Sequence, residues 1–291
     1  MSETISLAVP TAPVVRRVDP DVEALPLVFD SPHSGTSYPD DFAPAAPIRL
    51  LRMAVDDHVD ELFAEAPSHG AVLIAAEFPR VYIDPNRHHD DIDPDLLADG
   101  WPEPLQPSKK QKFGKSLIWR LIGRDSRIYD RGLTAAEVRH RIEHYWRPYH
   151  DCVQTALDEA YTRAGVVWHV NCHSMSARAG ANQEDAGQER PDFTVSDLDG
   201  RSTHSEFLDC VVETLAQRGY EVRVNDPYQG MELIRRYSDP AVGRHSLQIE
   251  VKRSLYMTES TREKSADYEA LQADLGRLCR SLADFARDGG G

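Results

Sequence analysis

Four positions with the chemistry of a metal site follow apolar runs in this 291-residue sequence. His173 lies at the end of a β-branched run, and His33, the pair Asn86-Arg87 and Glu250 lie at the ends of three others. Such runs predict buried strands, and open α/β sheets bind ligands at the carboxyl ends of their strands. Imidazoles bind zinc, a carboxylate can act as a base, and a guanidinium matches a carboxylate with two hydrogen bonds. The set predicts a zinc hydrolase that recognises an anionic substrate.

Each of these residues also has a structural explanation that the sequence leaves open. His33 lies in a turn with Pro and Gly, where it could simply hydrogen-bond the backbone. Asp56 opens a predicted helix, where a carboxylate is favoured as a cap and by the helix dipole. Glu250 could form a salt bridge with Lys252 or Arg253, since buried charges are normally paired. Their joint placement favours the metal site.

The elements that must position these residues alternate between strand and helix. We expect strands near 26–30, 71–76, 80–84, 166–172, 220–225 and 246–251. Helices are expected near 57–66, 134–164, 203–218 and 261–287. Thr134 and Glu137 form a capping box for the longest helix, and Pro148 should kink it. The alternation predicts an α/β fold of three layers, α/β/α, around a mixed, mostly parallel sheet.

Composition limits the class of protein. The net charge of −15 argues against a nucleic-acid partner, because phosphate binding needs a basic face. None of the four cysteines forms a C-x-x-C pair, no run is long enough to span a membrane, and the N-terminus lacks a signal-peptide pattern. We therefore expect a cytoplasmic protein with a lead-in over 1–20 and a single domain over 21–287. The irregular segments 88–116 and 176–201 have the length of lids or binding loops.

Seven segments in order resemble the N-formylglutamate amidohydrolase family, over about residues 26–257. They are Ser31–Gly35 (SPHSG), Asp56–Asp60 (DDHVD), Arg80–Arg87 (RVYIDPNR), Tyr145–Asp151 (YWRPYHD), Cys172–Met175 (CHSM), Asn225–Tyr228 (NDPY) and Gln248–Tyr256 (QIEVKRSLY). That family is distantly similar to zinc carboxypeptidases. The resemblance implies a twisted mixed sheet between helix layers, one zinc ion, and hydrolysis of N-formyl-L-glutamate to formate and L-glutamate.

The resemblance also implies roles for single residues. It implies that His33 and His173 bind zinc and that Asn86 and Arg87 bind the α-carboxylate of the substrate. Carboxypeptidases draw a carboxylate ligand three residues after the first histidine, where this chain has Thr36. Threonine cannot supply a carboxylate, so the ligand must come from elsewhere; we choose Asp56 because it matches the family's Asp-x-His segment, with Asp57 and His58 as alternatives.

The roles of Glu250, Arg80 and Arg178 follow from the mechanism expected of a zinc hydrolase. Glu250 would act as general base and acid around a water that zinc acidifies. Arg80 could stabilise the oxyanion, and Arg178 is a weaker candidate for the substrate's side-chain carboxylate. A metallocarboxypeptidase, another N-acyl-amino-acid deacylase, or a non-catalytic binder on the same scaffold remain alternatives. The sequence leaves the acyl group, the amino acid, the metal and the oligomeric state undetermined.

Overall fold

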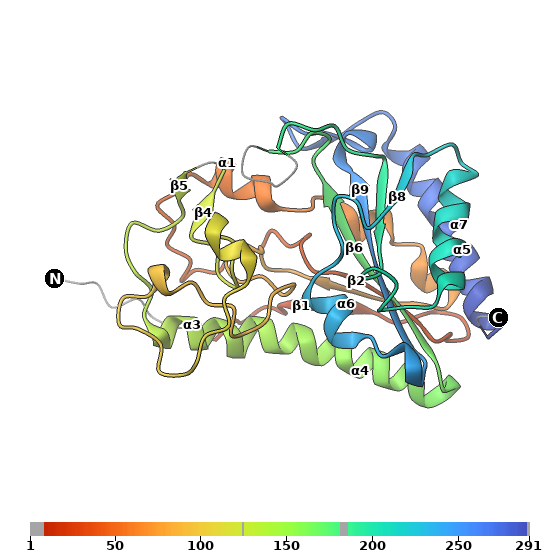
Figure 1. Cartoon of the computed structure of the whole chain (residues 1–291), viewed down its shortest axis with the longest axis horizontal. Helices are drawn as coiled ribbons and strands as arrows, with labels where there is room; N and C mark the ends of the chain where they lie inside the picture. The colour runs from red at the N-terminus through yellow and green to blue at the C-terminus, as the bar shows by residue number, and fades with distance from the viewer. Residues whose placement is uncertain (1–8, 124, 181–185, 290–291) are drawn as a thin grey trace.

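A mixed, mostly parallel sheet forms the centre of the molecule. The computed structural model describes residues 9–123, 125–180 and 186–289. Within these ranges, seven strands pair in the order β1-β3-β2-β6-β9-β7-β8 (Figure 1). They are β1 (Val15–Val18), β2 (Leu27–Ser31), β3 (Val72–Ala76), β6 (Val167–Met175), β7 (Phe193–Ser196), β8 (Val222–Val224) and β9 (Arg244–Lys252). The central strands β3, β2, β6 and β9 are parallel, whereas β1 and β7 each run antiparallel to a neighbour.

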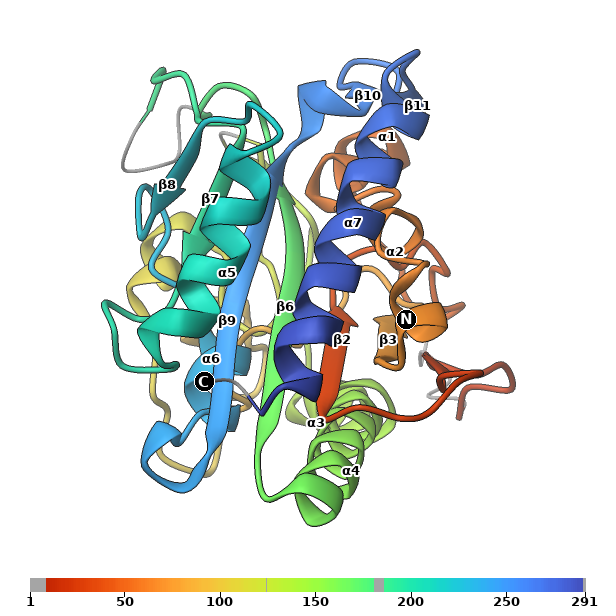
Figure 2. The ribbon, with the colours of Figure 1, turned by 90° about the vertical axis from the view of Figure 1, so that its right-hand side faces the viewer.

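Helices cover both faces of this sheet. The helices are α1 (Ile48–Leu51), α2 (Val59–Leu62), α3 (Ala135–Arg141), α4 (Arg147–Ala164), α5 (Ser205–Ala216), α6 (Glu232–Tyr237) and α7 (Tyr268–Arg287). Figure 2 shows α5 and α7 side by side in front of the sheet, with α4 beyond it. Along β2, Leu27 and Phe29 pack into the core beneath α5 and α7, and Val28 packs into the core beneath α4. The expected α/β fold with helices on both faces is confirmed.

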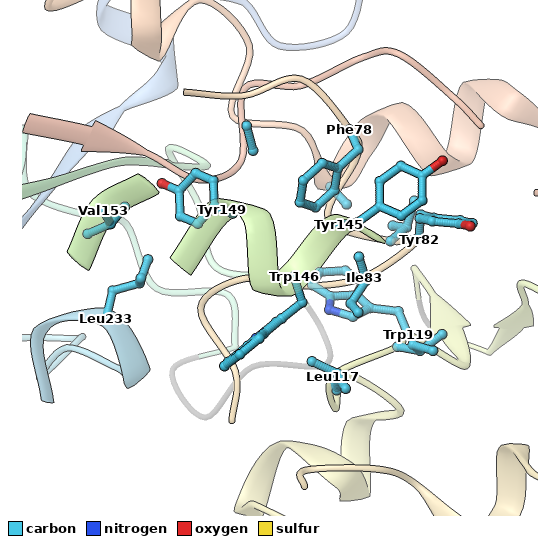
Figure 3. Close-up of a cluster of buried hydrophobic side chains, with 14 of the residues drawn as sticks. Phe78, Tyr82, Ile83, Leu117, Trp119, Tyr145, Trp146, Tyr149, Val153 and Leu233 are labelled. Atoms are coloured by element: carbon cyan, nitrogen blue, oxygen red, sulfur yellow. The ribbon is translucent and has the colours of Figure 1, made fainter. Parts of the chain in front are cut away.

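The capping box at the start of the long helical segment is also confirmed. Thr134 Oγ1 accepts from Glu137 N, and the Glu137 side chain accepts from Thr134 N at 2.8 Å. A π-helical stretch, Ile142–Trp146, separates α3 from α4 just before Pro148. Proline has no N–H to donate to the preceding turn, which explains a break in the regular α-helical hydrogen bonding there. Figure 3 shows Tyr145 and Trp146 from this stretch within an aromatic cluster.

The expected strand over 80–84 is wrong. Tyr82 N donates to Pro79 O at 2.9 Å, so the segment forms a turn. Val81, Tyr82 and Ile83 are fully buried, but they pack in the cluster of Figure 3 and not in the sheet. A short apolar run indicates burial without saying which neighbours bury it.

Other element boundaries also differ from those expected. The segment 1–20 contributes β1 to the sheet, where Val15 pairs with Ala76, although residues 1–8 lie outside the described part. The segment 176–201 contains β7. The last helix begins at Tyr268 and not near 261, because β10 (Met257–Thr258) and β11 (Glu263–Lys264) form a hairpin before it. A second small hairpin joins β4 (Leu121–Ile122) to β5 (Ser126–Arg127). In the described ranges, every helix is too short or too polar to cross a membrane.

Candidate metal centre

His33, Asp56 and His173 meet in a buried cluster at the carboxyl end of the sheet. Their candidate ligand atoms all lie within 4.8 Å of one another. Asp56 Oδ2 is 3.4 Å from His33 Nδ1 and 3.2 Å from His173 Nδ1, and the two imidazole centroids are 4.7 Å apart. All three side chains are almost fully buried. The three atoms can therefore face a single ion.

Parallel strands and one tight turn bring these residues together. His173 lies on β6, and His33 follows the end of the adjacent strand β2. A backbone hydrogen bond holds Asp56 beside His33, because Asp56 N donates to His33 O at 3.0 Å. A Cβ at Gly35 would lie 2.3 Å from the carbonyl carbon of Glu77, so only glycine lets this turn pack against the chain after β3.

The ring of His33 is oriented by a buried carboxylate. His33 Nε2 lies 2.7 Å from Asp84 Oδ1, which can only accept, so Nε2 carries the proton. Arg80 and Trp119 Nε1 both donate to Asp84 Oδ2, at 2.9 and 3.2 Å. Burial opposes ionisation of Asp84, but Arg80 and His33 outweigh it and hold its pKa well below its usual range. The result is an imidazole whose Nδ1 lone pair points at the cluster.

His173 is oriented in the same way by a buried amide. Its Nε2 lies 2.7 Å from Asn171 Oδ1, and Asn171 Nδ2 donates to Asp30 Oδ1 at 2.8 Å. The second contact fixes which end of the amide is the oxygen, so Nε2 of His173 must donate to it. Asn86 Nδ2 approaches the same nitrogen at 3.2 Å, but an amide N–H cannot bond a nitrogen that already carries a proton. His173 thus also presents an unprotonated Nδ1.

These assignments provide a test of whether the residues suit a metal ion. With both Nε2 atoms protonated and the rings neutral, two ring nitrogens and Asp56 Oδ2 turn lone pairs toward one point, an arrangement that a proton or a bound metal cation there would relieve. His33 Nδ1 is buried and makes no hydrogen bond to the described residues. Burial disfavours the Asp56 carboxylate, but the adjoining imidazoles of His173 and His33 and the charge of Arg253 hold its pKa well below its usual range. An ionised carboxylate and two neutral imidazoles, each held from behind, fit a divalent ion.

The two alternatives for the third ligand lie elsewhere. Asp57 forms an ion pair with Arg262. His58 Nδ1 lies 3.2 Å from Glu61, and its Nε2 faces the backbone carbonyl of Arg262. Of the three candidates, Asp56 is the residue beside both histidines.

Glu250 lies next to the cluster because β6 and β9 pair in register, which places it opposite His173. Gln248 Nε2 donates to Glu250 Oε1 at 2.9 Å. Burial raises the pKa of the Glu250 carboxyl. The nearby Asp56 raises it further, and His173 partly opposes the shift. The salt bridges that might have explained Glu250 are not formed, since Lys252 pairs with Asp192 and Arg253 with Asp56.

A cavity of about 770 Å³ is linked to the cluster through Asn86, although neither the three candidate ligands nor Glu250 line it. Asn86, which approaches His173, is part of its wall. The wall consists of Asn86, Arg87, His88, Asp91, Gln106, Pro107, Ser108, Leu198, Gly230, Met231, Glu232, Arg235 and Arg236. The Arg87 guanidinium is fixed by two carbonyls, with Nε donating to Lys115 O at 3.1 Å and Nη1 to Asn86 O at 2.8 Å.

Arg178 is not brought to this cavity. Its side chain is exposed, and its Nη1 donates to Gly187 O. The residues that orient the imidazoles, Asp84 and Asn171, were not predicted as part of the site. The alternation of His169, Asn171 and His173 with apolar residues could have revealed Asn171, since such residues share one face of a strand.

Comparisons with known proteins found relatives that cover most of this chain. The sequence model of the N-formylglutamate amidohydrolase family matches residues 25–257. Two curated relatives are N-formylglutamate deformylases: one from Pseudomonas putida, 28% identical over 81% of this chain and 83% of its own length, and one from Pseudomonas aeruginosa strain PAO1, 27% identical over 91% and 95%. The crystal structure of an N-formylglutamate amidohydrolase from Ralstonia eutropha JMP134 is 46% identical, covers 94% of this chain and 99% of its own, and superposes with a TM-score of 0.92.

Proposed function

We propose, because this chain belongs to the N-formylglutamate amidohydrolase family, that it hydrolyses the amide bond of an N-acyl amino acid. The first substrate to test is N-formyl-L-glutamate, giving formate and L-glutamate. Three relatives with this named activity or family support the choice. We further propose that the reaction depends on one zinc ion.

The observation that carries the proposal is the convergence of two unprotonated Nδ1 atoms and one carboxylate oxygen beside Glu250. His33, Asp56 and His173 would hold the ion, and nitrogen and oxygen ligands of this kind suit zinc. When bound, the ion supplies a Lewis acid that polarises the amide carbonyl and acidifies water.

The other residues act on the substrate and on the proton. Glu250 takes the proton of the attacking water and passes it to the leaving amine, and its raised pKa brings it closer to the working pH of a general base. Arg80, held by Asp84, faces the developing oxyanion. Asn86 and Arg87 bind the α-carboxylate from the cavity wall, with Arg87 already oriented by its two carbonyl contacts.

The test measures metal content and formate release together. We expect His33→Ala, Asp56→Ala and His173→Ala each to lose both the bound metal, by elemental analysis, and the activity. His144→Ala, a histidine on the π-helical stretch outside the cluster, should keep both. A His33→Ala protein that retained one equivalent of metal and full activity would refute the proposed ligand set.

Glu250→Gln separates an enzyme from a binding protein on the same scaffold. The variant should keep its metal and lose at least about a hundredfold in kcat, because general acid–base catalysis typically contributes 10² to 10⁴-fold. Retained turnover would rule Glu250 out as the base. Turnover of acetylated amino acids or small peptides in place of the formyl compound would show another deacylase or a carboxypeptidase.

A further inference from the structure

Lys115 does not itself line the cavity, but it contacts Arg87 of the cavity wall and the Trp119 ring on which Arg80 also lies. It follows the 3₁₀ helix Lys109–Phe113, and its carbonyl accepts from Arg87 Nε at 3.1 Å. Its Nζ lies 5.2 Å from the centroid of the Trp119 ring, and Arg80 Cζ lies 4.9 Å from the same ring. Trp119 is packed in the aromatic cluster beside Leu117 (Figure 3), so it is a rigid platform for both cations. Lys115 is thus tied to the residue that would hold the α-carboxylate.

The surroundings of Lys115 are strongly cationic. In the described ranges no carboxylate lies within 4.0 Å of Lys115 Nζ, whereas Lys252 and Lys264 both have acidic partners. Burial, together with the charges of Arg80, Lys110, Arg87 and Arg190, lowers the pKa of Lys115 to about 8. An ammonium group held half-buried among like charges is unfavourable until an anion joins it.

The nearby carboxylates are engaged with other groups. Asp84 binds His33, Arg80 and Trp119. Glu250 accepts from Gln248 and has been assigned to the proton transfer. Among the described residues, Asp84 and Glu250 are thus already engaged, and a ligand carboxylate could balance the charge of Lys115.

We propose that Lys115 binds the second, side-chain carboxylate of a dicarboxylic N-acyl amino acid while Arg87 binds the α-carboxylate. This inference rests on the proposed function and adds the residue that selects an acidic amino acid over a neutral one. It replaces Arg178, whose side chain lies on the exposed surface and donates to Gly187 O. Trp119 stops the Lys115 side chain from folding away, which keeps the ammonium group available to the ligand.

The test compares two substrates that differ only in charge, N-formyl-L-glutamate and N-formyl-L-glutamine. Lys115→Met should lower kcat/KM for the glutamate compound by about 10- to 100-fold, as expected for the loss of one charge-assisted hydrogen bond, mostly through KM. The same change should alter kcat/KM for the glutamine compound by less than about threefold, because no charge is bound there. Lys115→Arg should restore part of the preference.

Lys112→Met is the matched control, because Lys112 lies on the 3₁₀ helix just before Lys115 and its side chain is exposed. It should leave both substrates unchanged. Metal content and the unfolding midpoint of each variant show that the fold and the metal centre are intact.

Two outcomes would overturn the inference without touching the proposed function: equal losses on both substrates, or no loss on either. A metal-loaded wild type that released formate from neither substrate would overturn the proposed function, and this inference with it.

Discussion

The substitution Asn171→Leu tests whether Asn171 orients the imidazole of His173. Leucine has a similar volume but can neither accept from His173 Nε2 nor donate to Asp30, so both contacts, at 2.7 and 2.8 Å, are lost. Residues that orient a metal ligand typically contribute 10- to 100-fold in metal affinity, which is about 1.4–2.8 kcal/mol. We expect metal affinity to fall within that range, because Nδ1 of His173 is then no longer fixed as the unprotonated nitrogen.

Asn171→Leu should lower the stability of the metal-free protein only slightly. Asp30 keeps hydrogen bonds from Tyr149 Oη at 2.5 Å and His169 Nε2 at 2.9 Å, so its charge stays partnered. We expect the free energy of unfolding of the metal-free protein to fall by about 1–2 kcal/mol, near the lower end for a hydrogen bond to a charged group.

The assay is competition for the metal with a chelator of known affinity, read by elemental analysis of the protein, alongside denaturant unfolding of the metal-free form. Ser246→Ala is the control, since Ser246 Oγ contacts His169 Nδ1 at 2.7 Å on the far side of the same network. It should affect stability but not metal affinity. If Asn171→Leu held metal within threefold of the wild type, the assignment of His173 Nδ1 as a ligand would fail.

Three further measurements bear on the turn, the core and the cavity. Gly35→Ala should destabilise the protein by about 3 kcal/mol, since its Cβ would overlap backbone atoms, whereas Gly123→Ala, with no atom within 4 Å but a φ of +62°, should cost about 1–2 kcal/mol; equal midpoints in urea would contradict this. Burial lowers the pKa of His150 to about 3, so this ring stays neutral when folded but protonates on unfolding below pH 6.5. Its contribution to stability is present above that pH and is lost as pH falls, by about 1.5–2 kcal/mol between pH 6.5 and 5; unfolding curves of His150→Gln should lack that part of the pH dependence. Because the pKa of Lys115 is about 8, kcat/KM for N-formyl-L-glutamate should fall as pH rises through that value, relative to N-formyl-L-glutamine; parallel pH profiles would speak against a charged Lys115 in binding.

The grouping of candidate site residues could be foreseen because strand ends and metal ligands leave local signals. His33 follows the end of β2, and His173 lies near the carboxyl end of the adjacent parallel strand β6; parallel strands bring their carboxyl ends to one edge. Apolar, β-branched runs predicted β2, β3, β6 and β9 to within a few residues.

Other features depend on contacts that a single sequence does not show. The run over 80–84 has the composition of a strand, but α4 and its neighbours bury it as a turn. Asp84 looks like the end of that run, and its role as the partner of His33 arises only when the turn brings it there. Lys115 lies in a segment expected to be an irregular loop, and its cationic surroundings, Arg80, Arg87, Lys110 and Arg190, come from three separate stretches of chain.

The ladder between β6 and β9 matches nine residues with nine, from Val167 opposite Arg244 to Met175 opposite Lys252. Inserting or deleting one residue within either strand would turn every later side chain to the opposite face and separate His173 from Glu250. Loops around the cavity can lengthen or change without this penalty. Changes toward new acyl groups would thus be open to the loops, whereas the register that sets His173 opposite Glu250 would have to be kept.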